Sequence, residues 1–241
     1  MTDAPPPAGS GSALTFNSPL GDDAVARLLQ RLDDVRPSTI VDYGCGWGEL
    51  LLRMLERWPS ATGVGLDVHA PDIERARALA AERGVAERIR FDAAEASSHK
   101  DRADVVVSMG AYQAFGGVGE ALTALRTRLV PGGRALFGCE YWRSQPTDTE
   151  LANMWPGASA GDCVELPEIA EAAHTTGWTI LDMHDATQAE FDAFDLGHLR
   201  PRLEWALEHP GAEESNEARA AVVSWIRGHR RPMGFVTLVL G

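Results

Sequence analysis

The decapeptide IVDYGCGWGE occupies residues 40–49 and continues into LLLRML at residues 50–55. A β-rich apolar run enters this stretch, three glycines at alternate positions turn the chain, and an amphipathic helix leaves it. Glycine tolerates positive φ and lets the backbone approach a ligand closely. A strand, a glycine loop and a helix in that order predict a cofactor-binding loop.

The composition is that of an ordinary globular protein, with 44% hydrophobic and 24% charged residues among 241. A net charge of −13 argues against nucleic acid as a partner, because phosphate binding depends on Lys and Arg. The sequence contains no run of about 18 apolar residues, so we expect no membrane span. The N-terminus lacks a secretory pattern. Three cysteines without metal-ligand spacing predict a reduced, cytoplasmic protein with no metal site.

Alternating strand and helix patterns predict an α/β fold with a mostly parallel sheet. We expect residues 1–13 to form a flexible tail and residues 14–241 a single domain. The expected strands cover residues 39–43, 62–68, 89–92, 104–109, 134–139, 178–183 and 234–240, and the expected helices cover 22–32, 49–58, 71–84, 118–129, 166–176, 189–208 and 212–228.

The glycine spacing discriminates between cofactors. A dinucleotide loop needs the pattern G-x-G-x-x-G/A, whose helix N-terminus binds a pyrophosphate. Here the glycines are residues 44, 46 and 48, Glu49 follows them, and Asp42 precedes them. Because these acids attract a cation and repel a pyrophosphate, the loop favours a cationic ligand.

The stretch VDYGCGWG resembles the first motif of class I S-adenosylmethionine-dependent methyltransferases. Asp67 resembles the acid that ends the second strand of this family, and residues 92–94 resemble its third-strand motif. Residues 104–110, 129–133 and 234–240 are similar to the fourth strand, the turn before the fifth strand and the last strand. The resemblance implies a Rossmann-like, seven-stranded fold whose last strand is antiparallel, with a helical lid or insert.

The resemblance also implies a binding site for S-adenosylmethionine. Asp42 and the three glycines are expected near the methionine moiety, Asp67 at the ribose hydroxyls, Asp92 near the adenine amino group and Ser108 near the transferable methyl. The full set of implied cofactor-binding residues is Asp42, Gly44, Gly46, Gly48, Asp67, Val68, Asp92, Ala93, Ala94, Ser108, Met109 and Gly110.

Tyr112 and Glu140 are the catalytic candidates, since they follow the expected fourth and fifth strands. Tyr112 would orient the acceptor or bond its leaving proton, and its alternative role is to pack over the cofactor. Glu140 would act as a base or bind the acceptor, and the alternative is a solvated carboxylate at a strand end. We interpret the cluster of Arg227, Arg230 and Arg231 as a helix C-terminus that faces solvent.

The sequence therefore predicts a cytoplasmic methyltransferase that acts on an oxygen or nitrogen of a small-molecule metabolite, with carbon also open. Segments 141–165 and 184–232 are expected to form a substrate-binding lid. The alternatives are a non-catalytic, S-adenosylmethionine-binding regulatory module and an NAD-type oxidoreductase, which the glycine spacing disfavours. No nucleic-acid or membrane partner is expected, and a monomer and a homodimer both remain open.

Overall fold

A computed structural model of the protein describes residues 4–241. Residues 1–3 of the predicted flexible tail lie outside the described residues, and residues 4–13 contain turns but neither helix nor strand. The chain forms two compact units. The larger unit comprises residues 21–140, 166–185 and 235–241, and the smaller one comprises residues 4–20, 141–165 and 186–234.

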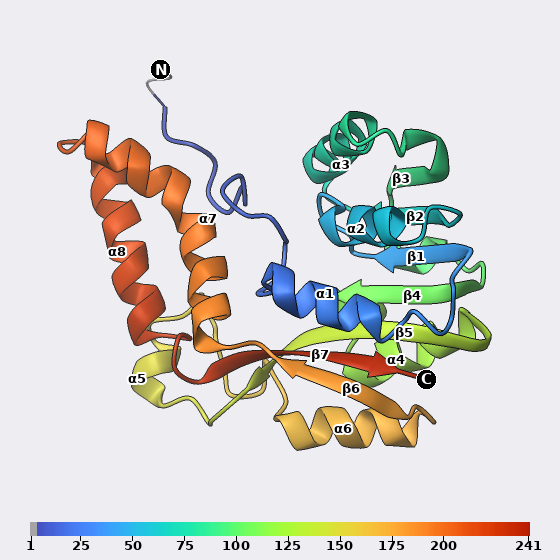
Figure 1. Cartoon of the computed structure of the whole chain (residues 1–241). Coiled ribbons are helices and arrows are strands. Elements are labelled where there is room, and N and C mark those ends of the chain that lie inside the picture. Colours follow the sequence, from blue (N-terminus) through green and yellow to red (C-terminus); the bar gives the residue numbers. More distant parts are fainter. Residues whose placement is uncertain (1–3) are drawn as a thin grey trace. The chain divides into compact units, whose positions relative to one another are not determined.

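A seven-stranded sheet in the order β3-β2-β1-β4-β5-β7-β6 forms the centre of the larger unit (Figure 1). Strands β1 to β5 run parallel, and β7 pairs with β6 in antiparallel register. The strands are β1 (Thr39–Tyr43), β2 (Thr62–Asp67), β3 (Ile89–Ala93), β4 (Ala103–Met109), β5 (Leu129–Trp142), β6 (Ile180–Asp185) and β7 (Met233–Leu240). This topology confirms the predicted α/β, Rossmann-like methyltransferase fold.

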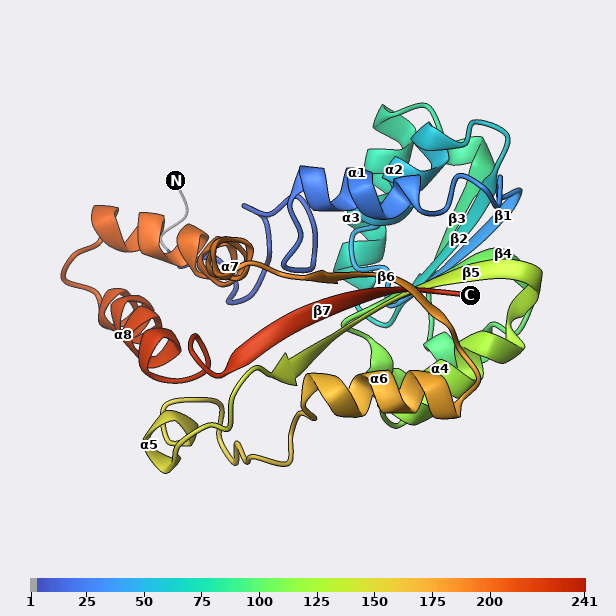
Figure 2. The same ribbon diagram turned by 60° about the horizontal axis from the view of Figure 1, so that its bottom comes forward.

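Helices cover both faces of this sheet (Figure 2). One face carries α1 (Asp22–Gln30), α2 (Glu49–Arg57) and α3 (Ala70–Glu82), and the other carries α4 (Val118–Thr127) and α6 (Leu166–Thr175). Three short 3₁₀ helices complete the unit: η1 (Ala86–Arg88), η2 (Ala96–Ser98) and η3 (Tyr112–Phe115). Because helices lie on both faces, β4 is buried almost throughout, as its apolar sequence predicts.

The fifth strand is longer than predicted. Its expected bounds were residues 134–139, because Pro131, Gly132 and Gly133 suggest a turn, yet β5 begins at Leu129 and continues through these residues. A register shift lies opposite them, between Ala103 and Val105 on β4. A Cβ atom at Gly133 would lie 2.6 Å from the carbonyl oxygen of Asp104, so only glycine fits there.

The smaller unit is mainly helical, with α5 (Asp148–Leu151), α7 (Gln188–Glu208) and α8 (Glu213–Arg227). Capping boxes begin two of these helices, formed by Thr147 with Glu150 and by Thr187 with Glu190. Helices α7 and α8 pack against each other. Among the described residues, no helix is both long and apolar enough to cross a bilayer.

The basic cluster after α8 differs from its prediction. Arg230 lies 2.7 Å from Asp192, and Nη2 of Arg231 lies 2.6 Å from Glu150. The preceding residue, His229, lies 3.2 Å from Asp195. Arg230 and Arg231 therefore lie beyond the end of α8 and pair with acids of α7 and α5, although the side chain of Arg231 remains 53% exposed.

Candidate functional site

The glycine loop connects β1 to α2. Both backbone conformation and packing require glycine at positions 44 and 48. All three glycines have positive φ, at 80° for Gly44, 53° for Gly46 and 76° for Gly48. A Cβ atom at Gly44 would lie 2.2 Å from that of Ala111, and one at Gly48 would lie 2.5 Å from the ring of Phe91. Glycine is therefore required at these two positions both by the left-handed backbone and by the close packing of Ala111 and Phe91 against the loop.

Asp67, the last residue of β2, holds this loop through its side chain. Its Oδ2 accepts the N–H of Gly46 at 2.8 Å, and its Oδ1 accepts the N–H of His69 at 2.9 Å. These two bonds fix the orientation of the carboxylate. Since each carboxylate oxygen accepts about two hydrogen bonds, both retain capacity for a ligand hydroxyl.

Asp42 is the buried acid of the site. Its side chain is 2% exposed, and its Oδ1 has no hydrogen-bond partner among the described residues. Burial and, to a lesser extent, the negative charge of Asp67 raise the pKa of Asp42 to about 7. A buried, unpartnered carboxyl group is unfavourable. The atom is therefore suited to a ligand that brings a positive charge or a donor.

Glu49 does not contribute its charge to the ligand side. The side chain is 6% exposed, with Oε1 2.7 Å from Nε of Arg53 and Oε2 2.5 Å from Nη2 of Arg83. The charge argument drawn from Glu49 is therefore wrong, because two guanidinium groups neutralise this carboxylate within the protein. Asp42 and Asp67 are the remaining acids that favour a cationic ligand.

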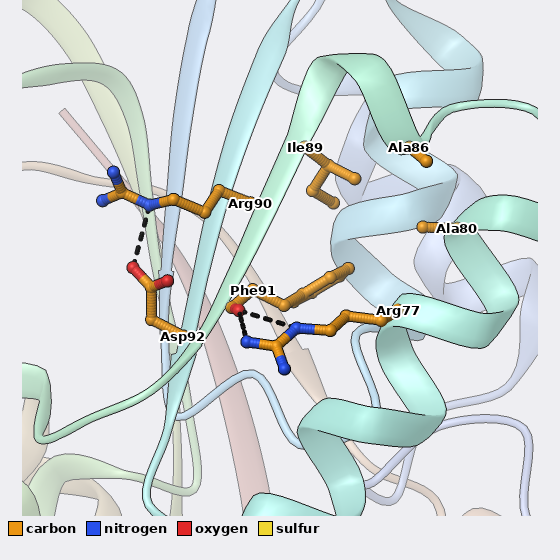
Figure 3. A pocket seen from close by; sticks show the side chains of 7 residues that line it. All are labelled: Arg77, Ala80, Ala86, Ile89, Arg90, Phe91 and Asp92. Carbon is orange, nitrogen blue, oxygen red and sulfur yellow. Dashed lines mark hydrogen bonds and ion pairs between the residues drawn. The ribbon is translucent and has the colours of Figure 1, made fainter.

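The carboxyl end of β3 carries Asp92, Ala93 and Ala94. The carboxylate of Asp92 lies 2.8 Å from Nε of Arg90. A cavity of about 250 Å³ lies beside it, between α3 and β3 (Figure 3). It is lined by Arg77, Ala80, Ala86, Ile89, Arg90, Phe91 and Asp92. Arg77 donates to the carbonyl oxygen of Phe91 at 2.5 and 3.1 Å, so this guanidinium covers the open edge of the strand.

The residues after β2 and β4 lie at the same edge of the sheet, where parallel strands end. Val68 is 72% exposed although it is apolar, so its side chain is available to cover a ligand. Ser108 is fully buried, and its Oγ has no hydrogen-bond partner among the described residues. Met109 is 9% exposed, and Gly110 donates its N–H to Gly138 on β5 at 2.8 Å.

The two catalytic candidates contact each other. The hydroxyl of Tyr112 in η3 donates to Oε1 of Glu140 at 3.2 Å, and Nε2 of Gln113 donates to the same oxygen at 2.7 Å. Gln113 directly follows Tyr112, and no role was predicted for Gln113 from the sequence. Its contact with Glu140 spans 27 residues and follows from the adjacency of β4 and β5.

The comparisons with known proteins decide the family. The sequence profile of a family described as a methyltransferase domain matches residues 18–183. The uncharacterized protein YjhP of Escherichia coli is 31% identical over 195 residues, which are 80% of this chain and 78% of the relative. This chain belongs to the methyltransferase family.

A solved structure identifies the cofactor of this methyltransferase. An S-adenosylmethionine-dependent methyltransferase of Geobacter sulfurreducens, crystallised with S-adenosylhomocysteine, has 26% sequence identity. The match has a TM-score of 0.83 and covers 97% of this chain and 96% of that one. A trans-aconitate 2-methyltransferase of Paracidovorax citrulli is 28% identical over 203 residues, covering 83% of this chain and 71% of the relative. The chain is therefore an S-adenosylmethionine-dependent methyltransferase, and the NAD-type alternative is set aside.

The site of this methyltransferase fits S-adenosylmethionine by its own geometry. Asp42 offers a buried acceptor atom, Oδ1, that has no hydrogen-bond partner among the described residues. Asp67 offers a fixed carboxylate with spare lone pairs. These features match a ligand with a cationic amino-acid end and a ribose diol.

Proposed function

We propose that this methyltransferase transfers a methyl group from S-adenosylmethionine to an oxygen or nitrogen atom of a small-molecule metabolite, with carbon as a further acceptor atom. The observation that carries the proposal is the contact of Glu140, near the carboxyl end of β5, with Tyr112 and Gln113, which follow β4. These polar side chains can orient an acceptor and take its proton.

The cofactor-binding residues are assigned by combining the resemblance with the contacts. Asp42 and the glycines of the loop would hold the methionine moiety, and Asp67 would accept the ribose hydroxyls. The remaining contacts would come from Val68 at the ribose, from Asp92, Ala93 and Ala94 at the adenine, and from Ser108, Met109 and Gly110 beside the methyl group. The unpartnered Oδ1 of Asp42 and the exposed Val68 support this assignment.

The protein supplies positioning more than covalent chemistry. When bound, S-adenosylmethionine brings a methyl group that is already activated for displacement. The residues of the chain then align the acceptor, keep water away and receive a proton where the acceptor must lose one. We assign acceptor orientation to Tyr112 and proton acceptance to Glu140.

The small-molecule class has independent support in charge and in chain organisation. The net charge of −13 is unsuited to nucleic acid. Segments 141–165 and 186–234 belong to the smaller unit, and we propose that 141–165 and 184–232 contribute a substrate-binding lid. The three cysteines are free thiols, which supports a cytoplasmic location. Within residues 4–241, no cluster of His, Cys, Asp or Glu could hold a metal ion.

The test is turnover with a radiolabelled methyl donor and a fraction of metabolites below about 1 kDa. The proposal predicts labelled product that depends on active enzyme and is absent with a heat-denatured sample. Protein and RNA are added to the same reaction as competing acceptors. Label on protein or RNA, with none on metabolites, would contradict the small-molecule class. Binding of the cofactor without any transfer would favour the regulatory module.

A further inference from the structure

Among the described residues, no cation compensates the charge of Glu140, whose partners are neutral side-chain donors. Its Oε1 accepts both described hydrogen bonds, from Tyr112 and Gln113. No described residue bonds to its Oε2, and no Arg, Lys or His nitrogen of residues 4–241 pairs with it. By contrast, Glu49 has two guanidinium partners and Asp92 has one. The two neutral donors fix this carboxylate and leave one of its oxygens for another molecule.

The charge around Glu140 restricts the acceptors that suit it. Asp42 and Asp67 end or nearly end neighbouring parallel strands, so acids gather at the same edge of the sheet. A carboxylate acceptor would bring a further negative charge to this edge, at a cost that rises as water is excluded. A group with an N–H or O–H would instead donate to Oε2 of Glu140.

Resting on the proposed function, we propose that the acceptor is an amine or a hydroxyl group, that it donates its hydrogen to Oε2 of Glu140, and that carboxylates are rejected. This acceptor class differs from the polycarboxylate in the name of the Paracidovorax citrulli relative. Gln113 is then a positioning residue, because its 2.7 Å bond orients Glu140.

The proposed step balances in atoms and charge. The lone pair of the acceptor nitrogen or oxygen forms a bond to the methyl carbon, while the carbon–sulfur bond breaks and its electron pair stays on sulfur. The proton of the acceptor passes to Oε2 of Glu140 and then to water. The positive charge of the donor is thereby replaced by a proton in solution, and no oxidant, reductant or metal is needed.

Alkaline lability of the transferred label tests this class directly. Methyl esters of carboxylates release methanol in mild alkali, whereas N-methyl groups and methyl ethers retain their label. After turnover with the radiolabelled donor and the metabolite fraction, we expect base-stable label in the wild-type products. Purified trans-aconitate, added alone as acceptor, should give no label. Volatile label from either sample would overturn the acceptor class.

Two variants assign the effect to Glu140. We expect Glu140→Gln to lower the rate of labelling about hundredfold while its affinity for S-adenosylhomocysteine stays within about twofold, because Gln preserves shape but takes no proton. Glu120→Gln, at an exposed position of α4, should retain wild-type rates. An unchanged rate for Glu140→Gln would overturn its role. Absence of every labelled product from wild-type enzyme would instead overturn the proposed function.

Discussion

The guanidinium carbon of Arg128 lies 4.8 Å from the ring centre of Tyr43. The same carbon lies 4.9 Å from the ring centre of Phe115. The rings of Tyr43 and Phe115 meet edge to face, with their centres 5.9 Å apart. Arg128 is 7% exposed, and its Nη1 has no hydrogen-bond partner among the described residues. The two rings therefore stabilise this buried cation. Tyr43 precedes Gly44 of the cofactor loop, and Phe115 ends η3, so one side chain links both parts of the site.

Loss of this link should affect both stability and cofactor binding. For Arg128→Gln we expect the free energy of unfolding to fall by about 2 kcal/mol, because two desolvated cation–π contacts are removed. Affinity for S-adenosylhomocysteine should fall several-fold, and Arg128→Lys should restore part of both losses. Urea denaturation and titration calorimetry measure these quantities.

Arg126 provides the matched control for Arg128. Its guanidinium carbon lies 5.1 Å from the ring centre of Trp178, and it belongs to the last turn of α4, of which Arg128 is the C-cap. We expect Arg126→Gln to lower stability by about 1 kcal/mol and to leave the affinity for S-adenosylhomocysteine unchanged. Equal effects of the two substitutions on affinity would contradict the link between Arg128 and the site.

The ion pairs of Glu49 predict a structural role for this residue. We expect Glu49→Gln to lower the free energy of unfolding by about 2 kcal/mol, because Arg53 and Arg83 lose a partner that is almost fully buried. The matched variant is Glu56→Gln, since Glu56 contacts the same Arg83 at 3.4 Å but is 45% exposed. It should change stability by less than about 0.5 kcal/mol. If urea denaturation showed equal losses in the free energy of unfolding for the two variants, the structural role of Glu49 would be refuted.

The raised pKa of Asp42 predicts that its contribution to the free energy of unfolding falls as pH rises. Its pKa is raised from 3.8 to about 7 in the folded protein, so the folded state binds the proton more tightly than the unfolded one. The stability that protonated Asp42 contributes should therefore be lost between about pH 4 and pH 7 and change little beyond. Asp42→Asn removes this loss and should be more stable than wild type at pH 8, by an amount on the order of 2–4 kcal/mol.

The same substitution at Asp104 should act in the opposite sense. Burial alone would raise the pKa of Asp104, but hydrogen bonds from Ser38 and Thr39 hold it below its usual value. Its stabilisation is present above the unfolded pKa and is lost as pH falls through the folded pKa. Asp104→Asn should therefore destabilise the protein at pH 8. Thermal denaturation at pH 5 and pH 8 compares both variants, and a destabilised Asp42→Asn at pH 8 would contradict the buried charge.

Local patterns in the sequence predict most of the strands and helices, because each pattern ends at a clear signal. The first strand spans residues 39–43 as predicted, since an apolar run meets Gly44 there. The fifth strand was predicted too short because Gly132 and Gly133 also occur in turns. Only pairing with β4 shows that they form an irregularity within the strand.

The candidate site divides in the same way. Asp42, the glycines and Asp67 follow from the loop and from the strand ends, which parallel pairing brings to one edge of the sheet. The side-chain partners of Glu49 and the stacking of Arg128 depend on tertiary packing, and no spacing in the sequence encodes them. For this reason the direction of the Glu49 carboxylate was predicted wrongly, and Arg128 was not considered.

The most direct test of this account is titration calorimetry of S-adenosylhomocysteine with wild-type protein and Asp67→Asn. The account predicts one molecule bound per wild-type chain, no heat with NAD, and an affinity that falls about ten- to hundredfold in the variant, equivalent to about 1–3 kcal/mol. Asp34→Asn, at an exposed acid, should bind as wild type does. Unchanged affinity for Asp67→Asn would contradict the cofactor site described for this protein.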